Sequence, residues 1–163
     1  MINKLFLLSI IFSFFSCSFK KDIHTISNDK YWTNDLNEIE LVMSYIMNDA
    51  KEYRSMIKMS DNEKSIFLDN YFHNLDPDTT TIQNEALQEL NNRAIECKTL
   101  FSEFDLGLSS DRAKIYIVYG PPVEEYKSNI NNMNLITWKY QIMGNIKEFN
   151  FISDNFGSYK LID

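Results

Sequence analysis

The chain is poor in residues that break regular structure and in clusters that bind nucleic acids. Only four glycines and three prolines occur among 163 residues, against twelve phenylalanines and nine tyrosines, which excludes a disordered or low-complexity protein. No cluster of lysine or arginine is longer than Lys20-Lys21, and the formal net charge is -7 at pH 7. Because an acidic chain repels a nucleic-acid backbone, we expect no nucleic-acid partner. A hydrophobic content of 44% suits one globular domain.

Groups for metal binding and for nucleophilic catalysis are also scarce. The two histidines, His24 and His73, are too far apart in the sequence to form a pair with ligand spacing. There is no Gly-x-Ser-x-Gly motif, and Gly120-Pro121-Pro122 cannot cradle a phosphate because two of its residues have no amide proton. Cys97 lies in a helical pattern, which favours a buried apolar role. We therefore expect neither a metal nor a cofactor.

The first 16 residues have the features of a lipoprotein signal peptide. Lys4 supplies a positive charge, and the apolar run 5–15 is too short to span a bilayer. A small residue followed by Cys17 resembles the bacterial lipobox, in which the cysteine thiol is acylated and the chain is cut before it. The sequence thus predicts a signal peptide over residues 1–16, lipidation at Cys17 and a polar tether over residues 17–33.

A lipid anchor implies a membrane address. Two or more acyl chains hold a protein stably on a bilayer. Ser18 differs from the Asp that retains lipoproteins in the inner membrane of many bacteria, so we expect the outer membrane. An ordinary signal peptide with an incidental Cys17, or a buried N-terminal helix, remains the alternative.

The periodicity of apolar residues predicts helices in the first part of the chain. Apolar positions spaced by three and four indicate helices over residues 34–58 and 82–104. Between them, Ser60 and Glu63 fit a capping box at the start of a further helix, which Pro77 should end.

The last part of the chain has a strand-like pattern. Residues 114–119, 135–140, 147–153 and 158–162 are rich in β-branched and aromatic residues, and residues 124–134 are polar, as in a long loop. Three helices packed on a small antiparallel sheet of about four strands make an α+β domain.

Two blocks of the sequence carry a resemblance to a known family. "NYFHNLDPDTTTIQNE", residues 70–85, and "GLSSDRAKIYIVYGPPVEEY", residues 107–126, are similar in order and content to two blocks of the GWxTD domain of bacterial envelope proteins. Leu108 stands where the naming motif has Trp, and Ser110 where it has Thr. The resemblance covers residues 34–163. Its motif positions are Asp76, Pro77, Asn84, Glu85, Gly107, Asp111, Arg112, Tyr119, Gly120, Pro121 and Pro122.

The resemblance implies a fold and an envelope setting, because the family has no established reaction. We therefore expect an interaction or accessory module that is attached to the membrane through its lipid anchor and contacts another envelope protein. Tyr126 is the sheet aromatic that we most expect at a partner surface.

A catalytic alternative uses four of the motif residues. Asp76, Glu85, Asp111 and Arg112 could converge as a carboxylate cluster with an arginine clamp, as in a hydrolase or transferase. The same residues could instead cap helix ends and fasten a junction between helix and sheet. The structural role needs no substrate, and the sequence favours it.

Overall fold

A computed structural model describes residues 30–102 and 106–162 of the chain. The predicted signal peptide, Cys17 and residues 17–29 of the tether lie outside the described residues. Tyr31 is only 5% exposed and belongs to the hydrophobic core, and the Asn91 side chain donates a hydrogen bond to the Lys30 carbonyl. The folded part of the chain therefore begins before residue 34, inside the stretch that the sequence assigned to the tether.

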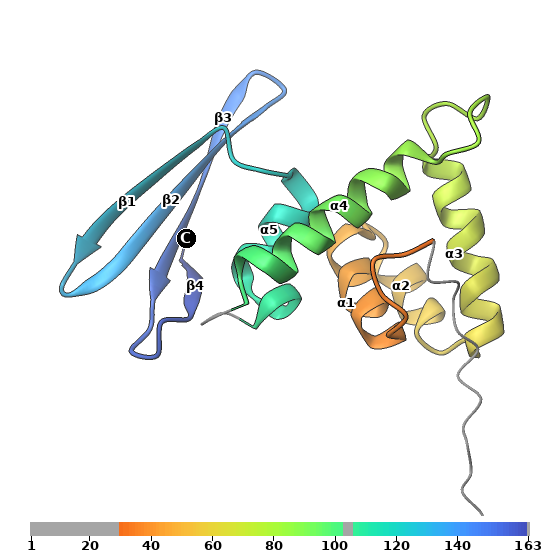
Figure 1. Ribbon diagram of the computed structural model, residues 1–163, viewed down its shortest axis with the longest axis horizontal. Coiled ribbons are helices and arrows are strands. Elements are labelled where there is room, and N and C mark those ends of the chain that lie inside the picture. The colour runs from red at the N-terminus through yellow and green to blue at the C-terminus, as the bar shows by residue number, and fades with distance from the viewer. Residues whose placement is uncertain (1–29, 103–105, 163) are drawn as a thin grey trace, which may run out of the picture.

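The domain is α+β, as predicted, with the helices preceding the sheet. Figure 1 shows a group of helices on one side and a sheet on the other, with the long helix α4 running between them. The sheet has four strands, all antiparallel, in the order β1-β2-β3-β4. The helices are α1 (Leu36–Ile46), α2 (Ala50–Met56), α3 (Asp61–Leu75), α4 (Glu85–Leu100) and α5 (Asp111–Tyr119). The strands are β1 (Glu124–Ile130), β2 (Met133–Ile142), β3 (Asn145–Ser153) and β4 (Tyr159–Ile162).

Local side-chain bonds decide where the first helices begin and end. The single helix predicted over residues 34–58 is wrong, because Met47 is extended and the Asp49 side chain accepts a hydrogen bond from the Lys51 amide, starting α2 anew. The capping box of α3 is confirmed: Ser60 and Glu63 exchange both bonds.

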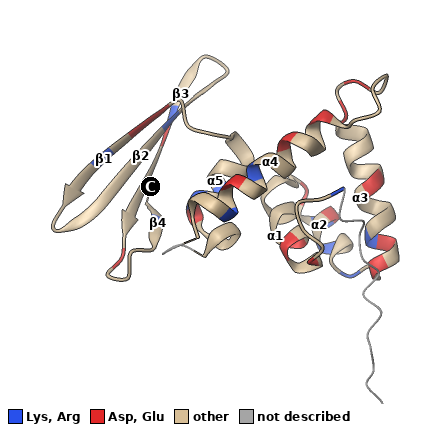
Figure 2. Ribbon diagram, viewed as in Figure 1, with Lys and Arg blue, Asp and Glu red and all other residues tan. Residues whose placement is uncertain are grey.

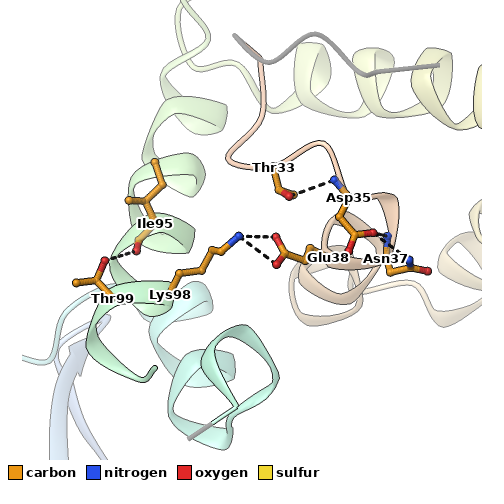
Figure 3. Close-up of polar contacts among 7 residues, drawn as sticks. All are labelled: Thr33, Asp35, Asn37, Glu38, Ile95, Lys98 and Thr99. Carbon is orange, nitrogen blue, oxygen red and sulfur yellow. Dashed lines mark hydrogen bonds and ion pairs between the residues drawn. The ribbon is translucent and has the colours of Figure 1, made fainter. Parts of the chain in front are cut away.

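Helix α4 is the spine of the domain. Its inner face is fully buried at Ala94 and Cys97, and burial raises the pKa of the Cys97 thiol to about 12, which keeps it protonated and unreactive. On the outer face, Lys98 contacts both carboxylate oxygens of Glu38 at 3.0 and 2.8 Å and so ties α4 to α1 (Figure 3). The pair is partly exposed, so it contributes no more than about 1 kcal/mol.

The strand predicted over residues 114–119 is wrong: this segment is the helix α5. The Ser110 hydroxyl accepts a hydrogen bond from the Ala113 amide at 3.0 Å, which caps the helix, and Asp111 places an acidic group in the first turn. Ala113 and Ile117 are at most 1% exposed. Tertiary packing against the core therefore overrides the β propensity of the isoleucines.

The loop predicted over residues 124–134 is also wrong. It forms β1, a turn and the start of β2. Asn131 and Asn132 have φ of 53° and 65°, the left-handed values that a two-residue hairpin turn requires and that asparagine tolerates. All seven residues of β1 are exposed, so the strand has no buried face to produce an alternating pattern.

The inner face of the sheet completes the core. Ile136, Trp138 and Tyr140 alternate along β2 and are each less than 5% exposed. The Trp138 ring contacts the rings of Phe101 and Phe151, with centroid distances of 6.0 and 4.8 Å. The sheet is thus held to the end of α4 mainly by aromatic packing.

Candidate functional site

The family motif forms the junction that joins α4 to α5. Gly107 has φ of 54°, a conformation that glycine adopts without strain, and Leu108 is only 5% exposed. The Leu108 carbonyl accepts a hydrogen bond from the Tyr45 hydroxyl at 3.0 Å, and the Ser110 hydroxyl donates to the Gly107 carbonyl at 2.9 Å. Each of these positions therefore has a structural partner inside the domain.

Asp111 and Arg112 fasten this junction to β4, the last strand. One carboxylate oxygen of Asp111 accepts a hydrogen bond from the Leu161 amide at 2.9 Å. The Arg112 guanidinium lies 4.7 Å from the ring centre of Phe101 and 4.3 Å from that of Tyr159. Both side chains thus connect the start of α5 to the sheet.

The Gly-Pro-Pro corner ends α5 and turns the chain toward the sheet. Gly120 has φ of 77°, its amide donates to the Tyr116 carbonyl at 2.7 Å, and its carbonyl accepts from the Tyr140 hydroxyl at 3.0 Å. Pro121 and Pro122 follow outside the helix, where their missing amide protons cost nothing.

Two side chains lie beside this corner: Tyr119, a motif residue, and Arg93, which the sequence did not indicate. The ring of Tyr119 lies 5.4 Å from that of Tyr140 and 5.3 Å from that of Phe149. Arg93, on α4, donates to the carbonyls of Ile117 and Val118 at 3.0 and 3.2 Å and so caps α5. The one sign of Arg93 in the sequence is its spacing of four residues from Glu89.

The other motif block lies where α3 ends and α4 begins. Asp76 follows the last residue of α3, and its carboxylate accepts from the Asp78 amide at 3.2 Å, on the far side of Pro77. Asn84 caps α4: its carbonyl oxygen accepts from the Leu87 amide at 2.8 Å, and its amide group donates to the Phe72 carbonyl at 2.6 Å.

Glu85 opens α4 and lies beside Asp76. The Thr81 hydroxyl donates to its carboxylate at 2.8 Å. This hydrogen bond holds the pKa of Glu85 below its ordinary value, and Asp76 is close enough to contribute. The carboxylate of Glu85 is therefore an ionised helix-start residue rather than a poised acid.

The structure does not bring the four candidate catalytic residues together. Asp76 and Glu85 lie at the start of α4, whereas Arg112 stacks on Phe101, the residue after its end. A helix of 16 residues is about 24 Å long, so the two pairs are separated by roughly that distance. No single substrate group can contact both pairs at once.

The outer strand of the sheet, β1, presents an exposed surface. Tyr126, in the middle of β1, is 52% exposed, and its hydroxyl donates to the Glu124 carboxylate at 2.6 Å. The Lys139 ammonium lies 4.8 Å from the centre of the Tyr126 ring. Further along the hairpin, residues 128–138 carry no charge (Figure 2). This arrangement gives an aromatic group held in place next to an uncharged hairpin end.

Glu125 links the exposed strand β1 to Trp138 in the core. The ionisation of Glu125 makes this link depend on pH. Partial burial alone would raise the pKa of Glu125, but hydrogen bonds from Lys127 and Trp138 and the nearby positive charges outweigh burial, so the pKa lies below its ordinary value. A carboxylate with a lowered pKa stabilises the fold above the pKa of the unfolded chain, about 4.3, and this contribution disappears as the pH falls.

Glu125→Gln should therefore flatten the acid-unfolding profile. We expect the free energy of unfolding of the variant to fall less than that of the wild type between pH 6 and pH 3. Urea unfolding at several pH values measures the free energy of unfolding of both proteins. Parallel profiles for the two proteins would contradict this assignment.

Residues 30–102 and 106–162 contain neither a metal-binding cluster nor a membrane-spanning helix. No group of three or more His, Cys, Asp and Glu side chains in these ranges is placed to hold a metal ion. Within the same ranges, no helix combines the length and the apolar character needed to cross a bilayer.

The architecture defines an α+β domain in which a Gly-x-x-Ser-Asp junction joins a helical group to an antiparallel sheet. Comparison with models of protein families matches residues 18–159 to the GWxTD domain. Because the match covers most of the chain, the chain belongs to the GWxTD domain family. Neither a curated protein nor a solved structure matches the chain.

Proposed function

We propose that the protein is a lipid-anchored interaction or accessory module of the bacterial cell envelope, held on the outer membrane through Cys17. The observation that carries the interaction role is β1. Every residue of this strand is exposed, and no other strand within residues 30–102 and 106–162 pairs with its outer edge. An edge strand offers unpaired main-chain N–H and C=O groups to a partner.

Side chains on β1 support the same role. Tyr126 presents a large amphipathic surface whose orientation is set by Glu124 and Lys139, and aromatic residues with a polar tip are enriched at protein interfaces. The strand contributes little to the core, apart from the bond between Glu125 and Trp138 at 2.7 Å. A partner can therefore cover β1 without disturbing the packing beneath it.

Site-specific photocrosslinking in the intact envelope tests the interaction role. A photoreactive residue at Tyr126 or Ser128 should give one defined adduct with another envelope protein. The matched control is Ile66, which is 65% exposed on α3. The proposal fails if β1 positions give no adduct, or give the same products as the position on α3.

Replacing Cys17 by alanine tests the anchor. The variant should move from the membrane pellet to the soluble fraction, because each buried methylene of the lost acyl chains contributes about 0.8 kcal/mol. Cys97→Ala is the control, since Cys97 is buried in the core, and this variant should stay in the pellet. Retention of Cys17→Ala in the pellet after a carbonate wash rules out the lipid anchor.

A further inference from the structure

A hollow at the start of α4 is lined largely by carboxamide side chains. It measures about 460 Å³, and five of its lining residues carry a carboxamide: Gln83, Asn84, Gln88, Asn91 and Asn92. We call it the carboxamide groove. Lys30, the one charged residue among the described residues that line it, is paired with Asp69. The groove therefore has no uncompensated charge of its own.

Two of these carboxamides already bind main-chain groups of the domain. Asn84 caps α4, and the Asn91 amide group donates to the Lys30 carbonyl at 2.9 Å. The carbonyl oxygen of the Asn91 side chain is buried and accepts no hydrogen bond from another described residue. Asn91 thus shows that a carboxamide on this face captures a main-chain carbonyl.

The remaining carboxamides are open to a ligand. Gln83, Gln88 and Asn92 are exposed, and their side chains make no hydrogen bond to another residue that the structure describes. A carboxamide has the same donor and acceptor as a peptide group, so it can donate to a carbonyl and accept from an N–H at once. The groove offers several such groups side by side.

The spacing of two of them matches an extended peptide. Gln88 and Asn92 are four residues apart on α4, which corresponds to a rise of about 6 Å along the helix. In an extended chain, peptide groups that face the same way recur every two residues, about 6.6 Å. Both carboxamides can therefore meet groups two residues apart on the same edge of one strand-like segment.

Apolar side chains complete the site. Leu87 is 7% exposed and borders the groove, while Ile82, at its rim, is exposed over its whole surface. Ile82 can cover one side chain of a bound segment. Among the described residues no aromatic side chain lines the groove, so they offer a sugar ring no face on which to stack.

We propose that the carboxamide groove binds an extended, uncharged polypeptide segment of a partner through its main chain. Gln88 and Asn92 each donate to a carbonyl and accept from an N–H of the segment, and Ile82 contacts one of its side chains. The proposal deepens the interaction role but is independent of β1, because it concerns the opposite end of the molecule.

The test uses the full chain, purified in detergent and labelled with nitrogen-15. The probe is a synthetic decapeptide of alternating threonine and valine, and a second peptide carries N-methyl groups on alternate amides. We expect the side-chain amide signals of Gln88 and Asn92 to shift with the first peptide. Methylation, which removes main-chain donors, should weaken binding about tenfold or more.

Matched variants locate the site. Gln88→Leu with Asn92→Leu should lower the affinity about tenfold or more, since two bidentate contacts are lost. The control is Asn70→Leu with Asn74→Leu, another exposed pair four residues apart, on α3, which should bind as the wild type does.

Five results would overturn the proposal, the first four of which concern the peptides, the variant and the protein itself. These four are the absence of shifts with the unmethylated peptide, equal binding of the methylated peptide, unchanged binding by the Gln88/Asn92 variant, and shifts that appear with protein concentration alone, which would make the occupant a second copy. Shifts caused by an uncharged oligosaccharide in place of the peptide would also count against it. Crosslinks from β1 are unaffected by any of these results, so the two proposals fail separately.

Discussion

Replacing Trp138 by alanine is expected to lower the free energy of unfolding by about 3–5 kcal/mol, the usual cost of deleting a buried large aromatic side chain. The Trp138 side chain is 2% exposed, and its ring contacts those of Phe101, Tyr116 and Phe151. The substitution leaves a cavity between the sheet and α4 and also removes the hydrogen bond to Glu125. The melting temperature should fall by about 10 °C or more.

Tyr126→Ala is the matched control for this variant. It removes an aromatic residue from the neighbouring strand of the same sheet, but one that is 52% exposed, so we expect a loss below about 1 kcal/mol. Thermal and urea unfolding of the two variants measure the difference. Equal losses would mean that the sheet is not held to the helices through Trp138.

The combined replacement of Asp111 and Arg112 by alanine should cost about 3 kcal/mol. Without Asp111 the part-buried Leu161 amide loses its acceptor, which costs about 1 kcal/mol or more. Without Arg112 the contacts of its guanidinium with Phe101 and Tyr159 are lost, at about 0.5–2 kcal/mol. The two residues act on the same strand, so their effects need not add.

The corresponding double variant at the other end of α4, Asp76→Ala with Glu85→Ala, provides the comparison. The bonds of these carboxylates to Asp78 and Thr81 are exposed, so we expect a smaller loss of stability than at the junction. Unfolding temperature and growth phenotype should be measured together. An Asp111/Arg112 variant that keeps the wild-type unfolding temperature but loses its biological activity would favour the catalytic alternative.

The sequence predicted the α+β class because three of its signals are strong. The capping box at Ser60 and the apolar spacing of α4 specify helices, and the alternation of Ile136, Trp138 and Tyr140 specifies a strand with one buried face. In these segments the local preference and the tertiary packing agree.

The errors arose where local preference and packing disagree. In α5, Ile115 and Ile117 favour a strand, yet the Ser110 cap and burial against α4 and α1 produce a helix. β1 was not recognised because a strand exposed on both faces has no hydrophobic period, and only the Asn131-Asn132 pair marks its turn.

The candidate sites were predicted unevenly for related reasons. The sequence identified the motif residues themselves. Which of them lie at each end of α4 depends on the length of this helix and on its packing. The carboxamides of the groove, such as Gln88 and Asn92, resemble an ordinary solvated helix face in the sequence. Only their convergence with Asn91 and Lys30 in space distinguishes them.

The two-sided exposure of β1 also bears on how the family can diverge. Apart from Glu125, no side chain of this strand rests on the core, so substitutions there cost little stability and can accumulate freely. Gly107, Ser110 and Asp111 have no such freedom, because each is bonded inside the junction or held in a special conformation. On the role proposed for β1, substitutions in this strand alone would change the partner while the scaffold stays the same.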